Sequence, residues 1–242
     1  SNIRLGTGIL PIYTRTATLL AFTSLSMYEL TKGRFILGLG VSHEDEMWPE
    51  HGIKLEKPFQ RTREYVHVIR NLLKDGNISF DGKVIKVPNV SFNFPMPAKQ
   101  VPIYIAALGP QMAALAGEIA DGVHFSMSTT EYLGEAINGM KEAARNAGRD
   151  PKQITVSGAV MTALGSEGEE KCRRHIAGFL RKPFFQYIIR SSGYSDAVDK
   201  IISAQKEGGL DKAGSVVPDK MLDALAMSGD SKTWKDKVEQ RQ

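Results

Sequence analysis

Several features that mark common protein classes are scarce or missing in this sequence. It has a single cysteine, Cys172, so no internal disulfide can form, and its helical surroundings predict a buried or half-buried thiol. No apolar run approaches the ~18 to 20 residues that a membrane span needs, and no signal-peptide pattern is found near the start. We therefore expect a cytoplasmic protein that makes no membrane contact.

Motifs for several kinds of chemistry are also missing. The five histidines include no pair with zinc-ligand spacing, so no metal site is expected, and neither a GxSxG elbow nor a GxxxxGK[ST] loop occurs. The net charge of +4 comes from scattered basic residues and not from a basic stripe interleaved with aromatics. Triad hydrolysis, nucleotide hydrolysis and nucleic-acid binding are therefore disfavoured, whereas a mild positive field suits an anionic small molecule.

What the sequence does contain is an alternation of short apolar runs with longer amphipathic segments. The apolar runs show little alternation, which is typical of parallel strands covered on both faces. Strands are predicted over 5–10, 34–41, 102–108, 122–127 and 154–161. Helices are predicted over 17–30, 58–73, 110–120, 131–147, 167–185, 195–207, 219–226 and 231–242. An Asp81-Gly82 turn between two alternating runs predicts a β-hairpin within an insertion over 77–100.

This order of elements predicts an α/β fold with right-handed crossovers. A dinucleotide-binding fold has a glycine-rich turn directly after its first strand, whereas Gly6 and Gly8 lie inside the run 5–10. A TIM (β/α)8 barrel agrees better with the pattern, although about five parallel strands leave it incomplete. We predict a single domain, 1–242, with an incomplete barrel, the β-hairpin insertion and a helical C-terminal part.

Two segments carry candidate chemistry on residue type alone. Gly6 and Gly8 weaken a buried strand, which indicates a bulge, a close helix contact, or a kink that offers a flat platform to a planar ring. Ser42 and His43 follow the strand 34–41, where a histidine that titrates near neutral pH can pass a proton. The alternative for that second segment is a solvated loop in which Ser42 caps a helix.

A third segment is the turn at Gly109, where a predicted helix begins directly after a strand. The free N–H groups of Gln111 and Met112 in such a turn can bind an anion. The remaining histidines that we considered, His67, His124 and His175, are expected to be packed or solvated.

Four motifs carry a resemblance to a known family. In order they are LGTGILPIYTR, ELTKGRFILGLGVSHE, KPFQRTREYVHVIRNLL and VPIYIAALGPQMAALAGEIADGV. Together they resemble the luciferase-like monooxygenase superfamily, and within it the branch of oxidoreductases that use the deazaflavin coenzyme F-420. The helical remainder is similar to the same branch. The resemblance implies a TIM barrel in which 5–10 is the third strand, with no counterpart here of the family's first two strands or its last.

The resemblance also implies a cofactor site. In the family, a non-prolyl cis peptide backs the cofactor ring, and it maps to the bond between Gly8 and Ile9; a β-branched residue at Gly8 is expected to prevent the bulge and abolish ring binding. His43 stands where some members have a glutamate proton donor, which makes it the candidate acid or base. The other matched positions flank the ring or bind phosphate: Gly40, Val41, Ser42, Leu108, Gly109, Gln111 and Met112.

Three functions remain open at this point. The first is an oxidoreductase that moves a hydride between coenzyme F-420 and an unidentified small organic substrate. The second is an FMN-dependent monooxygenase of the same superfamily. The third is a non-catalytic fragment that keeps only the barrel scaffold. Because an open barrel exposes strand edges, a homo-oligomer such as a dimer is expected.

Overall fold

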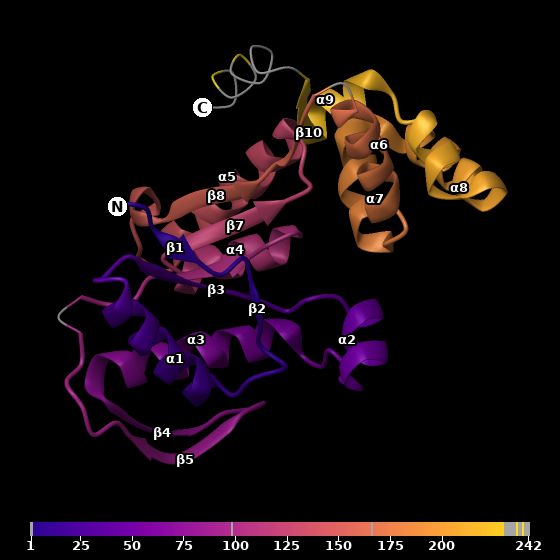
Figure 1. The fold of residues 1–242 in the computed structure, drawn as a ribbon. Helices are drawn as coiled ribbons and strands as arrows, with labels where there is room; N and C mark the ends of the chain where they lie inside the picture. The colour runs from indigo at the N-terminus through magenta and orange to yellow at the C-terminus, as the bar shows by residue number, and fades with distance from the viewer. Residues whose placement is uncertain (1, 98, 166, 230–235, 237–238, 240–242) are drawn as a thin grey trace. The chain divides into compact units, whose positions relative to one another are not determined.

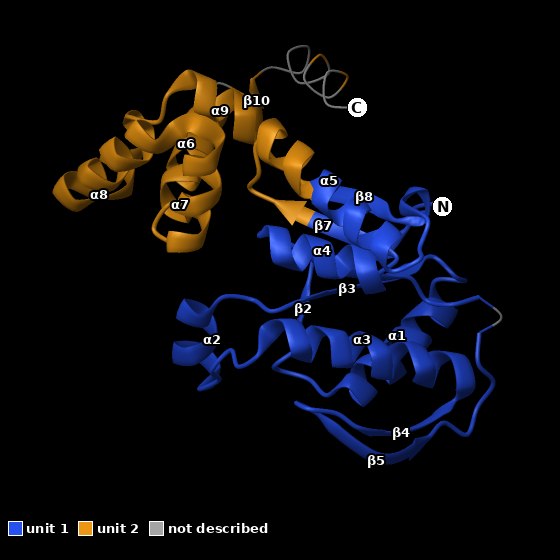
Figure 2. Cartoon of the chain, turned by 180° about the vertical axis from the view of Figure 1, so that it is seen from behind, with its two compact units in different colours: residues 1–124, 137–157 blue, residues 125–136, 158–242 orange. Residues whose placement is uncertain are grey.

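The structure, a computed structural model, describes residues 2–97, 99–165, 167–229, 236 and 239. It divides into two compact units (Figure 2), one made of 1–124 with 137–157 and the other of 125–136 with 158–242. The predicted helix over 231–242, apart from 236 and 239, lies outside the described residues. The single-domain assignment stays a prediction.

The main sheet consists of parallel strands (Figure 1). Its strands are β1 (Leu5–Gly6), β2 (Leu10–Pro11), β3 (Phe35–Gly40), β6 (Ile103–Ala106), β7 (Gly122–Ser126) and β8 (Thr155–Ala159). The order is β1-β3-β6-β7-β8, and β2 also pairs with β3. Because β1 and β2 are two parts of one interrupted strand, five parallel strands result, which confirms the predicted incomplete barrel.

Helices follow the strands close to the predicted positions. They are α1 (Ala17–Leu30), α2 (Glu44–His51), α3 (Pro58–Asp75), α4 (Pro110–Ile119) and α5 (Thr130–Asn146), with a short 3-10 turn, η1 (Pro151–Gln153). Thr16 caps α1 by accepting a hydrogen bond from the N–H of Leu19. Gly76, with a φ of 72°, ends α3. Of these elements, the sequence analysis did not predict α2 and η1.

The sheet has two unlike faces because side chains alternate along each strand. One set faces the helices, with α1 against β3 and α4 against β6, and is at most 1% exposed: Leu37, Leu39, Ile103, Ile105 and Val123. The other set, which we call the inner face, comprises Gly38, Gly40, Tyr104, Ala106, Gly122 and His124. Cross-strand pairs such as Gly38 with Tyr104, and Tyr104 with Gly122, place these residues side by side.

The predicted hairpin is present as β4 (Asn77–Asp81) paired antiparallel with β5 (Lys86–Ser91). Its turn is held by Glu64, a side chain of α3 that is only 3% exposed. The carboxylate accepts hydrogen bonds from the N–H groups of Lys83, Val84 and Ile85 at 2.8–3.0 Å. Burial alone would raise the pKa of Glu64, but hydrogen bonds from Gln60 and these N–H groups lower it overall.

The second unit is mainly helical. Its further elements are β9 (Met161–Leu164), α6 (Gly168–Phe179), α7 (Pro183–Ile189), η2 (Arg190–Tyr194), α8 (Ser195–Ser215), α9 (Asp219–Leu225) and β10 (Ala226–Gly229). The helix predicted over 167–185 is two helices, because Pro183 begins the second one. The strand predicted over 154–161 is likewise split, and β10, which pairs in parallel with β9, was not predicted. Cys172 is buried, as predicted.

Candidate functional site

The interrupted first strand contains a one-residue bulge. Gly6 pairs with Ile36 and Leu10 pairs with Leu39, so this strand advances from 6 to 10 while β3 advances only from 36 to 39. The extra residue confirms the bulge. The peptide bond between Gly8 and Ile9 is cis, as the resemblance implies.

The bulge is fastened to β3 through Thr7. The Oγ1 atom of Thr7 accepts a hydrogen bond from the N–H of Gly38 at 2.9 Å and donates one to the Gly38 carbonyl at 2.8 Å. The backbones cross so closely that a Cβ at residue 38 would lie 1.9 Å from the Thr7 carbonyl oxygen. A Cβ at Gly8 would meet no atom within 4 Å. The steric reason expected for glycine at Gly8 is therefore wrong, and it applies to Gly38 instead.

Ile9, Gly40 and Ala106 form a row across the inner face. A Cβ at residue 40 would lie 2.7 Å from the Cδ1 atom of Ile9 and 3.2 Å from the Cβ atom of Ala106. The pairing of Leu39 with Ile105 puts Gly40 beside Ala106 on the neighbouring strand. We call these three residues the inner-face row. The absence of a side chain at Gly40 lets Ile9 lie across β3, so Gly40 is buried while Ile9 and Ala106 are half-buried.

The residues after β3 lead directly into helix α2 and do not form an open loop. Ser42 has a φ of 63°, a conformation that is uncommon outside glycine. His43, and not Ser42, is the N-cap residue of α2, and its carbonyl accepts hydrogen bonds from the N–H groups of Glu46 and Met47. Val41, Ser42 and His43 are all half-buried at the carboxyl end of β3.

The turn after β6 occupies the same edge of the sheet. Gly109 is the N-cap residue of α4, Pro110 is in its first turn, and no side chain caps this end of the helix. Leu108 and Gly109 are half-buried, whereas Gln111 is exposed and Met112 is buried. Because β3 and β6 are parallel neighbours, the segments 40–43 and 108–112 lie at the same edge of the sheet, and the bulge at Gly8 and Ile9 lies on the strand next to β3. The functional roles of these residues stay predictions.

His124, which the sequence analysis expected to be packed or solvated, lies on the inner face beside Ala106. Its Nδ1 atom is 3.0 Å from the Oγ atom of Ser157 on β8. The signal was present in β7 as an alternation, since the buried Val123 and Phe125 flank the half-buried histidine. The alternation alone did not reveal the role of this histidine, because its partner Ser157 lies on another strand.

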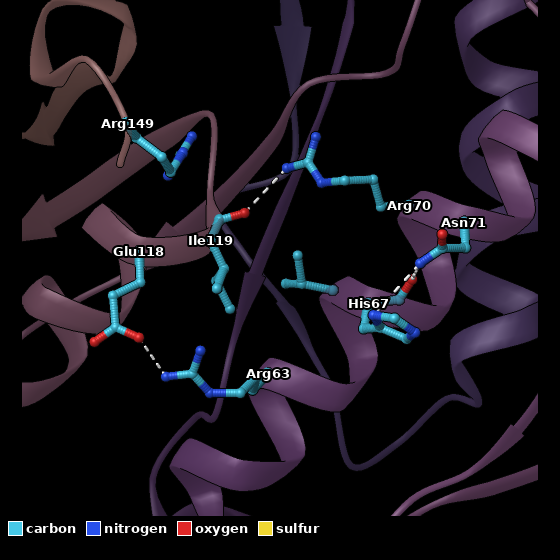
Figure 3. Close-up of a pocket in the computed structure, with 8 residues that line it drawn as sticks. Arg63, His67, Arg70, Asn71, Glu118, Ile119 and Arg149 are labelled. Carbon is cyan, nitrogen blue, oxygen red and sulfur yellow. Dashed lines mark hydrogen bonds and ion pairs between the residues drawn. The ribbon is translucent and has the colours of Figure 1, made fainter. Parts of the chain in front are cut away.

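The cavity shown in Figure 3 lies away from this edge. It has a volume of about 530 Å³ and is lined by α3, by the end of α4 and by Arg149. Arg149 donates hydrogen bonds to the carbonyls of Gly117 and Ala120, and Arg70 donates one to the Ile119 carbonyl. The two arginines thus satisfy the free carbonyls at the C-terminus of α4, the opposite end from the turn at Gly109. Their role is structural.

The described residues also lack two features that would change the interpretation of the site. Among the described residues, no group of three or more histidine, cysteine, aspartate or glutamate side chains could hold a metal ion. None of the helices in the described part of the chain is both long enough and apolar enough to cross a membrane.

Comparison with known sequences decides the family. The profile of luciferase-like monooxygenases matches residues 1–242. The chain belongs to this family. One relative is a 5,10-methylenetetrahydromethanopterin reductase from Methanolobus tindarius, which is 31% identical over 237 residues and is matched over 95% of this chain and 71% of its own length.

Solved structures agree with this fold. The coenzyme F-420-dependent tetrahydromethanopterin reductase from Methanopyrus kandleri superposes with a TM-score of 0.81 at 25% identity, covering 98% of this chain and 73% of the reductase. An F-420-dependent secondary alcohol dehydrogenase gives a TM-score of 0.76 at 21% identity, covering 98% of this chain and 69% of the dehydrogenase. The family and the fold that the resemblance implied are confirmed.

Proposed function

We propose that this family member is an oxidoreductase that transfers a hydride between coenzyme F-420 and a small organic substrate. The observation that carries the proposal is the inner-face row. The side chain of Ile9 lies over the buried Gly40, and the half-buried Ile9 and Ala106 together offer a shallow apolar surface to a planar ring beside the bulge. The space beside Gly8 is likewise open. The residues present therefore fit a flat tricyclic group.

The role that we propose for each residue follows from where it lies in the site. Ile9 and Ala106 would back the ring, Gly40 makes room for the Ile9 side chain, and the uncapped N–H groups at Gln111 and Met112 would attract the phosphate of the cofactor. When bound, the deazaflavin supplies the hydride chemistry. The part of the protein is to orient the reactants, to limit access of water, and to exchange a proton through His43 at the carboxyl end of β3.

A titration of the purified chain with F-420 and with FMN, followed by fluorescence quenching, tests the proposal. We expect saturable binding of F-420. The family's description favours the FMN-dependent monooxygenase as second candidate; binding of FMN alone, with oxygen consumed by the reduced cofactor, would establish it. Binding of neither would leave the scaffold hypothesis.

The homo-oligomer is also a proposal, and the exposed β1 edge supports it. Leu5, on β1, is 47% exposed. Light scattering coupled to size-exclusion chromatography is expected to give a mass of twice 26.6 kDa; a monomer mass would contradict the dimer.

Replacing Gly8 by valine is expected to weaken F-420 binding at least tenfold, because the new side chain enters the space that the ring would occupy, while the melting temperature changes little. Isothermal titration calorimetry and a thermal melt measure the two effects. Gly139→Val is the matched control, because a Cβ at Gly139 also meets no atom within 4 Å but lies on α5. Equal affinity in wild type and Gly8→Val would remove Gly8 from the ring-binding surface.

Replacing His43 by alanine is expected to lower kcat about 100-fold, as loss of a general acid or base does, with less than a twofold change in the Kd for F-420. His51→Ala is the control, because His51 ends the same helix. The measurement requires a substrate identified by screening alcohols, aldehydes and imines against F-420 absorbance. Unchanged kcat would exclude His43 from proton exchange.

A further inference from the structure

His124 extends the inner-face row by one strand. Ala106 pairs with His124, just as Gly40 lies beside Ala106, so the row continues from β3 through β6 to β7. Val123, the residue before it, is fully buried on the helix-facing side. The His124 side chain therefore lies on the inner face, two strand spacings or roughly 10 Å from Gly40.

The hydrogen bonds of Ser157 determine which nitrogen of His124 carries the proton. The hydroxyl of Ser157 donates to the carbonyl of Val123 at 3.1 Å, and a carbonyl can only accept. The single hydroxyl proton is thereby used, so the Ser157 oxygen must accept at its 3.0 Å contact with Nδ1 of His124. In the neutral ring the proton is then on Nδ1, and Nε2 has a free lone pair.

Burial of the His124 side chain favours its neutral form. Burial lowers the pKa of the His124 imidazole below its ordinary value. The Nε2 atom has no hydrogen-bond partner among the described residues. It is also not among the fully enclosed polar atoms that lack a partner, so a ligand on the inner face can reach it. A half-buried histidine that uses only one nitrogen can accept a hydrogen bond from such a ligand without a change in charge.

We propose that His124 is a specificity-determining residue of the ring site, whose Nε2 atom accepts a hydrogen bond from a ring N–H group of the bound cofactor. The inference rests on the proposed function. The pyrimidine part of flavins and deazaflavins carries such an imide N–H between two carbonyl groups. An acceptor at the end of the row therefore selects the edge of the ring that offers a donor, and it fixes how the ring is turned on Ile9 and Ala106.

The first test needs no ligand. In ¹⁵N-labelled protein at pH 7.5, the His124 nitrogens, assigned by their loss in His124→Phe, are expected to show a protonated Nδ1 and an unprotonated Nε2. In Ser157→Ala the two tautomers should mix, because nothing then holds the proton on Nδ1. An Nε2–H signal in wild type would overturn the inference, since that atom could not accept.

The second test measures F-420 affinity. His124→Phe, which retains a ring of similar shape, is expected to weaken binding about tenfold, as the loss of one well-placed hydrogen bond does. Ser157→Ala should weaken it about threefold, and His124→Gln, which keeps an acceptor, should recover part of the loss. His67→Phe, on the exposed face of α3, is the control. Circular dichroism melts verify that each variant is folded.

The outcomes separate the two claims. Failure of wild type to bind F-420 would overturn the proposed function. Wild-type binding together with unchanged affinity in His124→Phe would overturn the role of His124 alone. Loss in His124→Phe with recovery in His124→Gln supports it, because a purely packing role for the ring would not be rescued by a flexible amide.

Discussion

Replacing Gly38 by alanine is expected to destabilise the protein by about 3 kcal/mol or more, because an added methyl group cannot be accommodated where two backbones cross. The new Cβ would lie 1.9 Å from the carbonyl oxygen of Thr7 and 3.0 Å from its carbonyl carbon. Backbone cannot rotate away as the end of a side chain can. The bulge must therefore move, and Thr7 loses both hydrogen bonds to residue 38.

Urea unfolding followed by circular dichroism measures this effect as a lower midpoint. Gly139→Ala is the control and is expected to leave the midpoint unchanged or to raise it slightly, because Gly139 lies in α5 with open space around it. Gly38→Ala should also lose F-420 binding, since the displaced bulge carries Ile9 with it. A Gly38→Ala variant with the wild-type midpoint would contradict the close crossing.

Replacing Glu64 by alanine is expected to destabilise the protein by about 4 kcal/mol, because three turn N–H groups and Gln60 lose an ionised acceptor together. Glu64 is buried at 3% exposure, and its hydrogen bonds are 2.6–3.0 Å long. Urea unfolding at pH 7 measures the loss. Glu118→Ala is the control, because the exposed ion pair of Glu118 with Arg63 contributes at most about 1 kcal/mol. Equal losses in both variants would contradict the role of Glu64.

The contribution of Glu64 should also depend on pH. The folded-state pKa of Glu64 is lowered from 4.5, so the folded state holds the carboxylate more strongly than the unfolded state does. Its stabilisation is complete above the unfolded pKa and is lost as the pH falls through the folded value. The difference between wild type and Glu64→Ala should therefore shrink below about pH 4.5. A difference that stays constant to pH 3 would contradict the lowered pKa.

Periodicity was sufficient to predict most of the fold. The helices α1, α3, α4 and α5 and the strands of the main sheet lie within about two residues of their predicted ends, because long amphipathic segments and buried apolar runs differ clearly in pattern. The Asp81-Gly82 turn identified the hairpin in the same way. Helix α2 was missed because Pro49 lies inside it, and β10, with the sequence AMSG, has no apolar run to mark it.

The site was less accessible to sequence reasoning because its key contacts join distant residues. The sequence placed His43 and the turn at Gly109 each directly after a predicted strand, and the family resemblance joined them in one site. Nothing local distinguishes Gly38 from Gly8, since the difference lies in the crossing of Thr7 over β3. The orientation of His124 likewise depends on Ser157, 33 residues away. Such pairings appear only when strands are in register.

The central claim is that the inner-face row is where the cofactor ring lies, and a crystal structure of the chain soaked with F-420 tests it most directly. We predict the tricyclic ring in van der Waals contact with Ile9 and Ala106, the two half-buried members of the row. A ring located elsewhere, such as in the arginine-lined cavity between α3 and the end of α4, would contradict the account.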